Sequence, residues 1–314
     1  MRRLKSKKYY LMLLIVVVTW GFDPIVNRYL YGYYSAAALS SLSTFASALL
    51  FLFLARKQLH LLSRQFFRIS LPICLANSLA CVLQRIGLQY TTPSHYAFLE
   101  HLSCAAVPLI LFLCFRRRPR PIQLISALLC LIGCLLLTGV ILSPLSFGIG
   151  DILCGAAGLL LGFGIAATSE CTQGLDIKLF TALHMCTYFI TSLSLAIALH
   201  FIKVNGAPIE RIEFSFSPLA LAAAILFGLL TVGICWLLRN EATRHIHPTA
   251  VAVISPFAAV LTALISVLGG MERISLSLAI ACVLIPLAAI LAGLGDRPRP
   301  KEAASHHGPE HTSA

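Results

Sequence analysis

Long runs of apolar residues, separated by short polar turns, occupy most of the chain. A helix that crosses a membrane needs about 17 to 25 predominantly apolar residues, and ten runs reach that length. They cover roughly residues 9–31, 35–55, 69–90, 93–115, 121–142, 147–169, 178–202, 217–238, 248–268 and 274–294. The intervening turns are too short for a soluble domain, and strand-like alternation of polar and apolar residues is absent. The pattern therefore predicts an all-α membrane protein with ten transmembrane helices.

The apolar pattern also repeats within the chain. Residues 93–138 align with residues 248–293 at a constant offset of 155 and without a gap. Each segment has a short polar turn, an apolar span, a turn with an arginine and a second span. Because an odd number of spans separates the copies, they must cross the membrane in opposite directions, an arrangement typical of transporters. The sequence predicts two inverted five-helix repeats, at residues 9–142 and 147–295.

Composition and charge agree with this reading. The 314 residues are 58% hydrophobic and only 11% charged, and the net charge is +12. Nineteen of the 24 Lys and Arg residues fall on the side of the N-terminal tail and five on the other. This asymmetry predicts that both termini are cytoplasmic, with a basic segment at residues 1–8 and a disordered tail at residues 296–314. Basic turns beside the membrane account for the charge without nucleic acid.

The first apolar run imitates a signal peptide because it follows a basic start. It is long for such a segment, and Asp23-Pro24 stands where a small-residue cleavage site would be needed. We interpret it as a retained first helix in a multi-pass protein of the cytoplasmic (inner) membrane. The eleven cysteines contain no CxxC spacing, and Cys130 and Cys134, one turn apart, are interpreted as small packing residues. No metal or cofactor is expected.

Several short motifs resemble the drug/metabolite transporter superfamily, and in particular its EamA-like members. In chain order they are Trp20-Gly21, residues 88–94 (LQYTTPS), residues 150–153 (GDIL), residues 241–249 (EA…HPT) and residues 269–275 (GGMERIS). The resemblance covers residues 9–295 and rests on the order and spacing of these motifs. It implies ten helices in two inverted repeats, alternating access, and a central cavity lined mainly by helices 1, 3, 4, 6, 8 and 9.

Two segments depart from the family pattern. Arg117-Arg118-Pro119 stands where a Glu-Arg pair is usual, and Glu100-His101 lies in a span that is normally less polar. Both departures bear on the substrate more than on the fold.

Ionisable residues inside the spans are the candidate site. An ionised side chain at the centre of a bilayer costs roughly 2.5 to 3.5 kcal/mol on insertion scales, so such residues are usually functional or paired. The predicted topology puts six polar residues from three helices in the outer part of the bilayer: Asp23, Arg28, Gln84, Arg85, Glu100 and His101. We interpret them, with Trp20, Asn27 and Trp236, as substrate-binding residues. In that reading the arginines hold anionic groups, and Glu100 or Asp23 pairs with an amine or carries a proton. A static ion-pair cluster is the structural alternative.

Inversion predicts a second polar level near the cytoplasm. Glu170, Arg239 and Asn240 lie near the inner ends of their helices and are candidates for an inner gate. His184 stands alone on an apolar face and is expected to be a hydrogen-bonded core residue. The GxxxG spacing of Gly158 and Gly162 predicts close helix packing, static or sliding.

The leading functional hypothesis is a secondary transporter of a small polar or amphipathic metabolite, amino-acid-like or nucleoside-like. An intramembrane enzyme is the alternative, although HExxH and GxSxG motifs are absent. A channel or receptor fits less well, since no sensor domain or filter-like repeat is visible. The expected partners are a small-molecule substrate and the lipid bilayer. Protons as a coupling ion and a second copy of the chain, in a homodimer, are further candidate partners.

Overall fold

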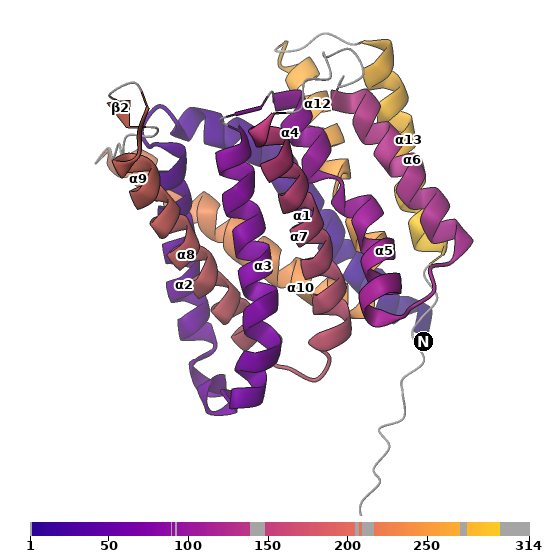
Figure 1. Cartoon of the computed structure of the whole chain (residues 1–314), viewed down its shortest axis with the longest axis horizontal. Coiled ribbons are helices and arrows are strands. Elements are labelled where there is room, and N and C mark those ends of the chain that lie inside the picture. Colours follow the sequence, from indigo (N-terminus) through magenta and orange to yellow (C-terminus); the bar gives the residue numbers. More distant parts are fainter. Residues whose placement is uncertain are drawn as a thin grey trace, which may run out of the picture.

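The computed structural model describes residues 2–88, 90–91, 93–138, 148–204, 207–208, 217–270 and 275–295 (Figure 1). Ten helical segments in these ranges are long and apolar enough to cross a membrane. The predicted all-α membrane fold with ten spans is therefore confirmed. The predicted tail at residues 296–314 and the turn at residues 142–147 lie outside the described residues.

The first repeat consists of five spans, the fourth of which is broken into two helices. Its elements are α1 (Arg2–Leu30), α2 (Ala36–Leu54), the 3-10 helix η1 (Arg56–Leu61), α3 (Arg64–Leu88), the broken pair α4 (Pro93–Glu100) and α5 (Ser103–Phe115), and α6 (Pro121–Thr138).

The second repeat follows the same plan. Its elements are α7 (Ile149–Cys171), α8 (Ile177–Phe201), the two-residue strands β1 (Lys203–Val204) and β2 (Ala207–Pro208), α9 (Pro218–Gly228), the π-helical segment η3 (Leu229–Ile234), α10 (Cys235–His245), the broken pair α11 (Pro248–Ile254) and α12 (Phe257–Leu268), and α13 (Leu276–Leu294). The segments α9, η3 and α10 together form one span.

The bundle has two ends, which we call the N-terminal face and the opposite face. The N-terminal face is where α1 begins and α13 ends, at the bottom of Figure 1. The opposite face is where α1 ends and α13 begins. The repeats are interleaved between these faces, because α3 packs on α7, α2 on α8, and α6 on α13. The charge asymmetry predicts that the N-terminal face is cytoplasmic.

The fourth span of each repeat is broken at equivalent positions. In the first repeat the helix is interrupted at His101-Leu102, and in the second at Ser255-Pro256, which the offset of 155 aligns within one residue. Short backbone bonds of the i to i−3 type bridge both interruptions, such as Cys104 N–H to the His101 carbonyl oxygen (3.0 Å). Broken helices at membrane depth are tolerated where the freed backbone groups find protein partners or line a cavity.

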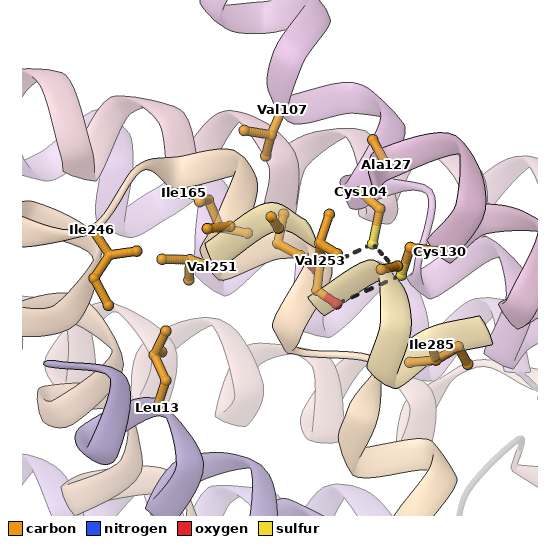
Figure 2. Packing of buried hydrophobic residues seen from close by; sticks show 14 of the residues in the cluster. Leu13, Cys104, Val107, Ala127, Cys130, Ile165, Ile246, Val251, Val253 and Ile285 are labelled. Atoms are coloured by element: carbon orange, nitrogen blue, oxygen red, sulfur yellow. Dashed lines mark hydrogen bonds between the residues drawn. The ribbon is translucent and has the colours of Figure 1, made fainter. Parts of the chain in front are cut away.

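Pro256 has a direct consequence for packing. Without an N–H it cannot bond the carbonyl oxygen of Ala252, four residues earlier. The Cys104 thiol takes this place and donates to the Ala252 oxygen over 3.1 Å, and the Cys130 thiol lies 3.6 Å from the Val253 oxygen (Figure 2). Cys104 and Cys130 belong to the first repeat, so they bond the backbone of the second. Cys130 is a buried packing residue, as expected, and both thiols also contact carbonyls that the proline break leaves without a helical N–H partner.

The glycines of the GxxxG pair allow α7 to approach the broken span. A Cβ atom on Gly158 would collide with the carbonyl oxygen of Leu99, and one on Gly162 would come within 2.8 Å of the Ala106 Cβ. The predicted close packing is therefore confirmed, and it is directed at the α4–α5 break. A larger side chain at Gly158 would push the two helices apart there.

Candidate functional site

A cavity of about 860 Å³ lies between the two repeats. Its lining reaches the opposite face, where Tyr31, Thr138 and Ser275 contribute. The helices expected to line it all do so, and α2 adds Ser40 and Ser43. A cavity of this size accommodates a small metabolite.

Among the described residues, one ring stack, one ion pair and one hydrogen bond join the two repeats at the N-terminal face. They are the stack of Tyr9 on His245 (ring centroids 3.9 Å apart), the ion pair of Arg117 with Glu170 (3.5 Å) and the hydrogen bond from Arg120 to the carbonyl oxygen of Gly295 (3.2 Å). Below the cavity, a buried apolar cluster that includes Leu13, Val107 and Ile246 fills the space between the repeats (Figure 2). The bundle is therefore packed shut at this end.

Most of the predicted site residues meet in the cavity. Those that line it are Trp20, Asp23, Asn27, Gln84, Glu100, His101, Trp236 and Arg239. Arg239 was expected in an inner gate with Glu170 and Asn240, and it lies instead with the residues expected at the outer level. The cavity thus combines parts of both predicted levels.

Four predicted residues are placed elsewhere or not described. The side chain of Arg28 is exposed and is not among the described residues that line the cavity. Glu170 lies in the ion pair with Arg117 at the N-terminal face. Asn240 is buried, with its amide nitrogen 3.5 Å from the Thr181 hydroxyl of α8. The side chain of Arg85 lies outside the described residues.

Trp20 is fixed across the interface of the repeats. Its indole Nε1 donates to the carbonyl oxygen of Thr231 over 2.9 Å. Thr231 lies in η3, and π-helical turns displace backbone carbonyls from the regular helix ladder. The next residue, Gly21, allows close approach, because a Cβ atom there would lie 2.9 Å from the Leu261 Cβ of α12. The Trp20-Gly21 motif therefore positions α1 against both η3 and α12.

Asp23 and Asn27 share one face of α1, as their spacing predicts. The Asn27 amide donates to the Asp23 carboxylate over 2.7 Å. Pro24 lies between them inside the continuous helix α1, and the Thr262 hydroxyl of α12 donates to the nearby carbonyl oxygen of Gly21 (2.8 Å). Polar groups around Pro24 are thus bonded to each other and to the second repeat.

Arg239 is the buried cation of the site. Its side chain is 6% exposed, and its guanidinium carbon lies 4.6 Å from the ring centre of Trp236 and 5.8 Å from that of Trp20. No acidic side chain in the described part of the structure comes within 4.0 Å of it. Glu100 lies within electrostatic range but does not form an ion pair with it. The tryptophan faces partly replace the hydration that a buried cation loses.

The inverted repeat relates cavity residues of the first repeat to cavity residues of the second. At the offset of 155, Gln84 of α3 corresponds to Arg239 of α10, and Glu100 corresponds to Ser255. All four residues line the cavity. Equivalent positions of the two repeats therefore present different chemical groups to the same space.

Some lining residues escaped the sequence reasoning. Tyr96 and Tyr188 line the cavity, as do the α2 hydroxyls of Ser40 and Ser43. The run of Ser and Thr at residues 40–47 was the available signal. Part of this run serves close packing, since a Cβ atom on Gly228 of α9 would come 2.5 Å from the Ser43 Cβ.

His184 differs from the expectation. It is fully buried, but neither ring nitrogen has a hydrogen-bond partner among the described residues. Its ring meets Trp236 edge-on, with centroids 4.4 Å apart at 88°. His184 thus supports the tryptophan beside Arg239 through ring packing. Within the described ranges, no group of three or more His, Cys, Asp or Glu side chains is arranged to hold a metal ion.

The fold and the cavity define a ten-helix membrane protein built from two repeats around one internal site. The model of the EamA-like transporter family matches residues 7–139 and 148–294, so the chain belongs to that family. It is therefore a membrane transporter of the drug/metabolite transporter superfamily.

Solved structures share the fold. One of them, described only as a crystal structure of a protein, has a TM-score of 0.71 and 17% sequence identity, over 93% of this chain and 99% of that chain. At this identity the likeness concerns the fold alone. No curated protein matches the chain.

Proposed function

We propose that the protein is a secondary transporter that moves a small polar or amphipathic metabolite, amino-acid-like or nucleoside-like, across the cytoplasmic membrane by alternating access. The observation that carries this proposal is the cavity of about 860 Å³ between the repeats, with acidic, basic, amide and aromatic side chains on its walls. Buried ionisable groups that face a shared cavity are typical of substrate pathways.

The asymmetry of the two ends supports alternating access. The cavity lining reaches the opposite face, whereas Tyr9–His245 and Arg117–Glu170 join the repeats at the N-terminal face. Rocking of one inverted repeat against the other would separate these pairs and expose the same cavity to the N-terminal face. Glu170 thus remains a gate candidate, in an ion pair that must open during transport.

Proton coupling is part of the proposal. Asp23 and Glu100 are the acidic side chains in the described cavity wall, and a carboxylate that alternately faces two compartments can carry a proton. Substrate-driven proton movement, recorded with a pH dye inside the vesicles, is expected for the wild type and not for the variant Glu100→Gln if Glu100 is the carrier. A homodimer is a further proposal, to be tested by light scattering in detergent.

Counterflow in liposomes tests the transport function. Vesicles containing the purified protein and excess unlabelled leucine or uridine are diluted into the same labelled solute. We expect transient accumulation of one labelled solute without ATP. The variant Ala263→Phe, which places a ring in the cavity wall, should abolish it.

The matched control is Ala279→Phe, the same substitution at an exposed position of α13. It should accumulate the label as the wild type does. Equal counterflow by both variants contradicts transport through this cavity. Accumulation of neither solute by the wild type contradicts the amino-acid-like or nucleoside-like substrate class, and chemical conversion of the label would favour the enzyme alternative.

A further inference from the structure

We infer that Arg239 binds the carboxylate of the transported solute, so that the substrate is an organic molecule with a single carboxylate held beside Trp20 and Trp236. Calling the bound molecule a substrate rests on the proposed transport function. The binding site itself is argued from the geometry of Arg239.

The state of the guanidinium points to a missing partner. Arg239 is buried in the middle of a bundle, its Nε has no hydrogen-bond partner in the described part of the chain, and no described acid lies within 4.0 Å. Removing a cation from water without a partner is costly, and contacts with aromatic ring faces offset only part of this cost. Buried polar groups left unsatisfied in a protein call for an explanation. Because Arg239 lines the cavity, a carboxylate in the cavity can supply the counter-charge that no described acid provides within 4.0 Å.

The surroundings favour a planar anion. A guanidinium presents a planar fork of N–H donors that matches the two oxygens of a carboxylate. Trp236 is held edge-on by His184, and Trp20 is tied to the carbonyl oxygen of Thr231. Two anchored rings therefore restrict the plane of the guanidinium and leave an apolar surface for the body of the solute.

The charges of the cavity favour a monoanion. Arg239 is a cation, and Asp23 and Glu100 place carboxylates on the same described wall. Glu100 is close enough to Arg239 to interact with it electrostatically. A phosphate with two negative charges would be repelled by these carboxylates more strongly than a carboxylate with one. The site should accordingly discriminate against inorganic phosphate.

The chain carries its own reporter for this site. It has two tryptophans, and both line the cavity beside Arg239. Tryptophan emission of the purified protein in a neutral detergent is therefore titrated with a matched series on one carbon skeleton. The series contains leucine, 4-methylpentanoate without the amine, 4-methylpentanamide without the charge and isopentylamine without the carboxylate. Inorganic phosphate is the fifth probe.

The expected result is a saturable change in emission with leucine and 4-methylpentanoate, and none with the amide, the amine or phosphate. In Arg239→Gln the affinity for 4-methylpentanoate should fall about 10- to 100-fold, as expected for the loss of hydrogen bonds to a charged group. Arg239→Lys keeps the charge without the fork and should fall in between. Arg118→Gln, at an exposed turn residue, should bind as the wild type does.

Equal responses to 4-methylpentanoate and its amide, or no response to either, would overturn the inference. So would undiminished carboxylate binding by Arg239→Gln. A folding defect is recognised separately, because the size-exclusion profile and the helical circular dichroism of each variant are recorded before titration. The two proposals also fail in different ways. Carboxylate binding at Arg239 without counterflow would refute transport alone, and counterflow of uridine unaffected by Arg239→Gln would refute the carboxylate site alone.

Discussion

In the first repeat, the break of the fourth span presents Glu100 and His101 to the cavity, whereas the equivalent break of the second repeat presents Ser255. The third span of each repeat shows the reverse difference. There the first repeat supplies the neutral Gln84 and the second supplies Arg239 at the corresponding position. In the described cavity wall, the acids Asp23 and Glu100 thus come from the first repeat and the cation Arg239 from the second.

The comparison distinguishes structural features that both repeats share from chemical groups that differ between them. The shared plan gives two broken helices and one cavity between the repeats. The side chains at matching positions then give the cavity a negative and a positive side. A solute with a carboxylate at Arg239 would lie across this division, and an amine on the same molecule would face the acids.

Exchanging the two matching residues is the most severe test of the comparison. The double variant Gln84→Arg, Arg239→Gln keeps the composition of the cavity and moves the cation to the first repeat. We expect 4-methylpentanoate binding to stay at least about tenfold weaker than in the wild type, because Trp20 and Trp236 flank position 239. The tryptophan titration measures it, with each single variant as a control. Recovery of wild-type affinity would mean that any cation in the cavity suffices.

Neutralising the acid of the first repeat should have a smaller and opposite effect. Glu100→Gln removes a negative charge in electrostatic range of Arg239. Binding of 4-methylpentanoate should therefore strengthen by about threefold to tenfold, since an exposed cavity screens much of the interaction. Leucine should gain less, because its amine loses an attractive charge.

Glu241→Gln is the matched control for this change. Glu241 is paired with Arg244 at the N-terminal face and is not among the described residues of the cavity wall. It should leave both affinities unchanged. Weaker 4-methylpentanoate binding by Glu100→Gln would contradict the assignment of opposite charges to the two repeats.

Much of the fold followed from the sequence, because membrane insertion imposes a simple rule on apolar length. The ten spans, the two repeats and the close packing at Gly158 and Gly162 were all predictable from one-dimensional patterns. The placement of Asn27 beside Asp23 followed from helix geometry in the same way. These features depend on neighbours along one helix.

The position of Arg239 was not predictable in this way. Counting residues along a span gives depth but not the direction of a side chain. The π-helical segment η3 precedes α10 and carries an extra residue in its turn, which rotates the following side chains by about 100° relative to a regular helix. The contacts of His184 and Cys104 were not predictable for a related reason, since their partners, Trp236 and the Ala252 carbonyl, lie on other helices. Such contacts depend on three-dimensional packing.

The two breaks also differ in cause, which leads to a third prediction. The break in the second repeat contains Pro256, whereas His101-Leu102 in the first contains no proline. Pro256→Ala restores an N–H that can bond the Ala252 carbonyl and straighten the helix. If the break acts as a hinge, leucine counterflow should slow a few-fold while tryptophan-reported binding is unchanged. Pro286→Ala in α13, away from the described cavity wall, is the control. Unchanged counterflow would identify the break as a static bend.

The smallest expected effect concerns the thiols that connect the repeats at this break. Cys104→Ala removes the donor to the Ala252 carbonyl and leaves a buried acceptor without its partner. The free energy of unfolding should fall by about 1 to 3 kcal/mol, measured by titration with sodium dodecyl sulfate in mixed micelles. Cys104→Ser keeps a hydroxyl donor and should lose less. Cys114→Ala, at an exposed cysteine near the end of the same helix α5, should change the free energy of unfolding by less than about 0.5 kcal/mol. Because the first repeat carries the thiol and the second carries the proline, equal stability of the Cys104 and Cys114 variants would show that the Pro256 break does not depend on the other repeat.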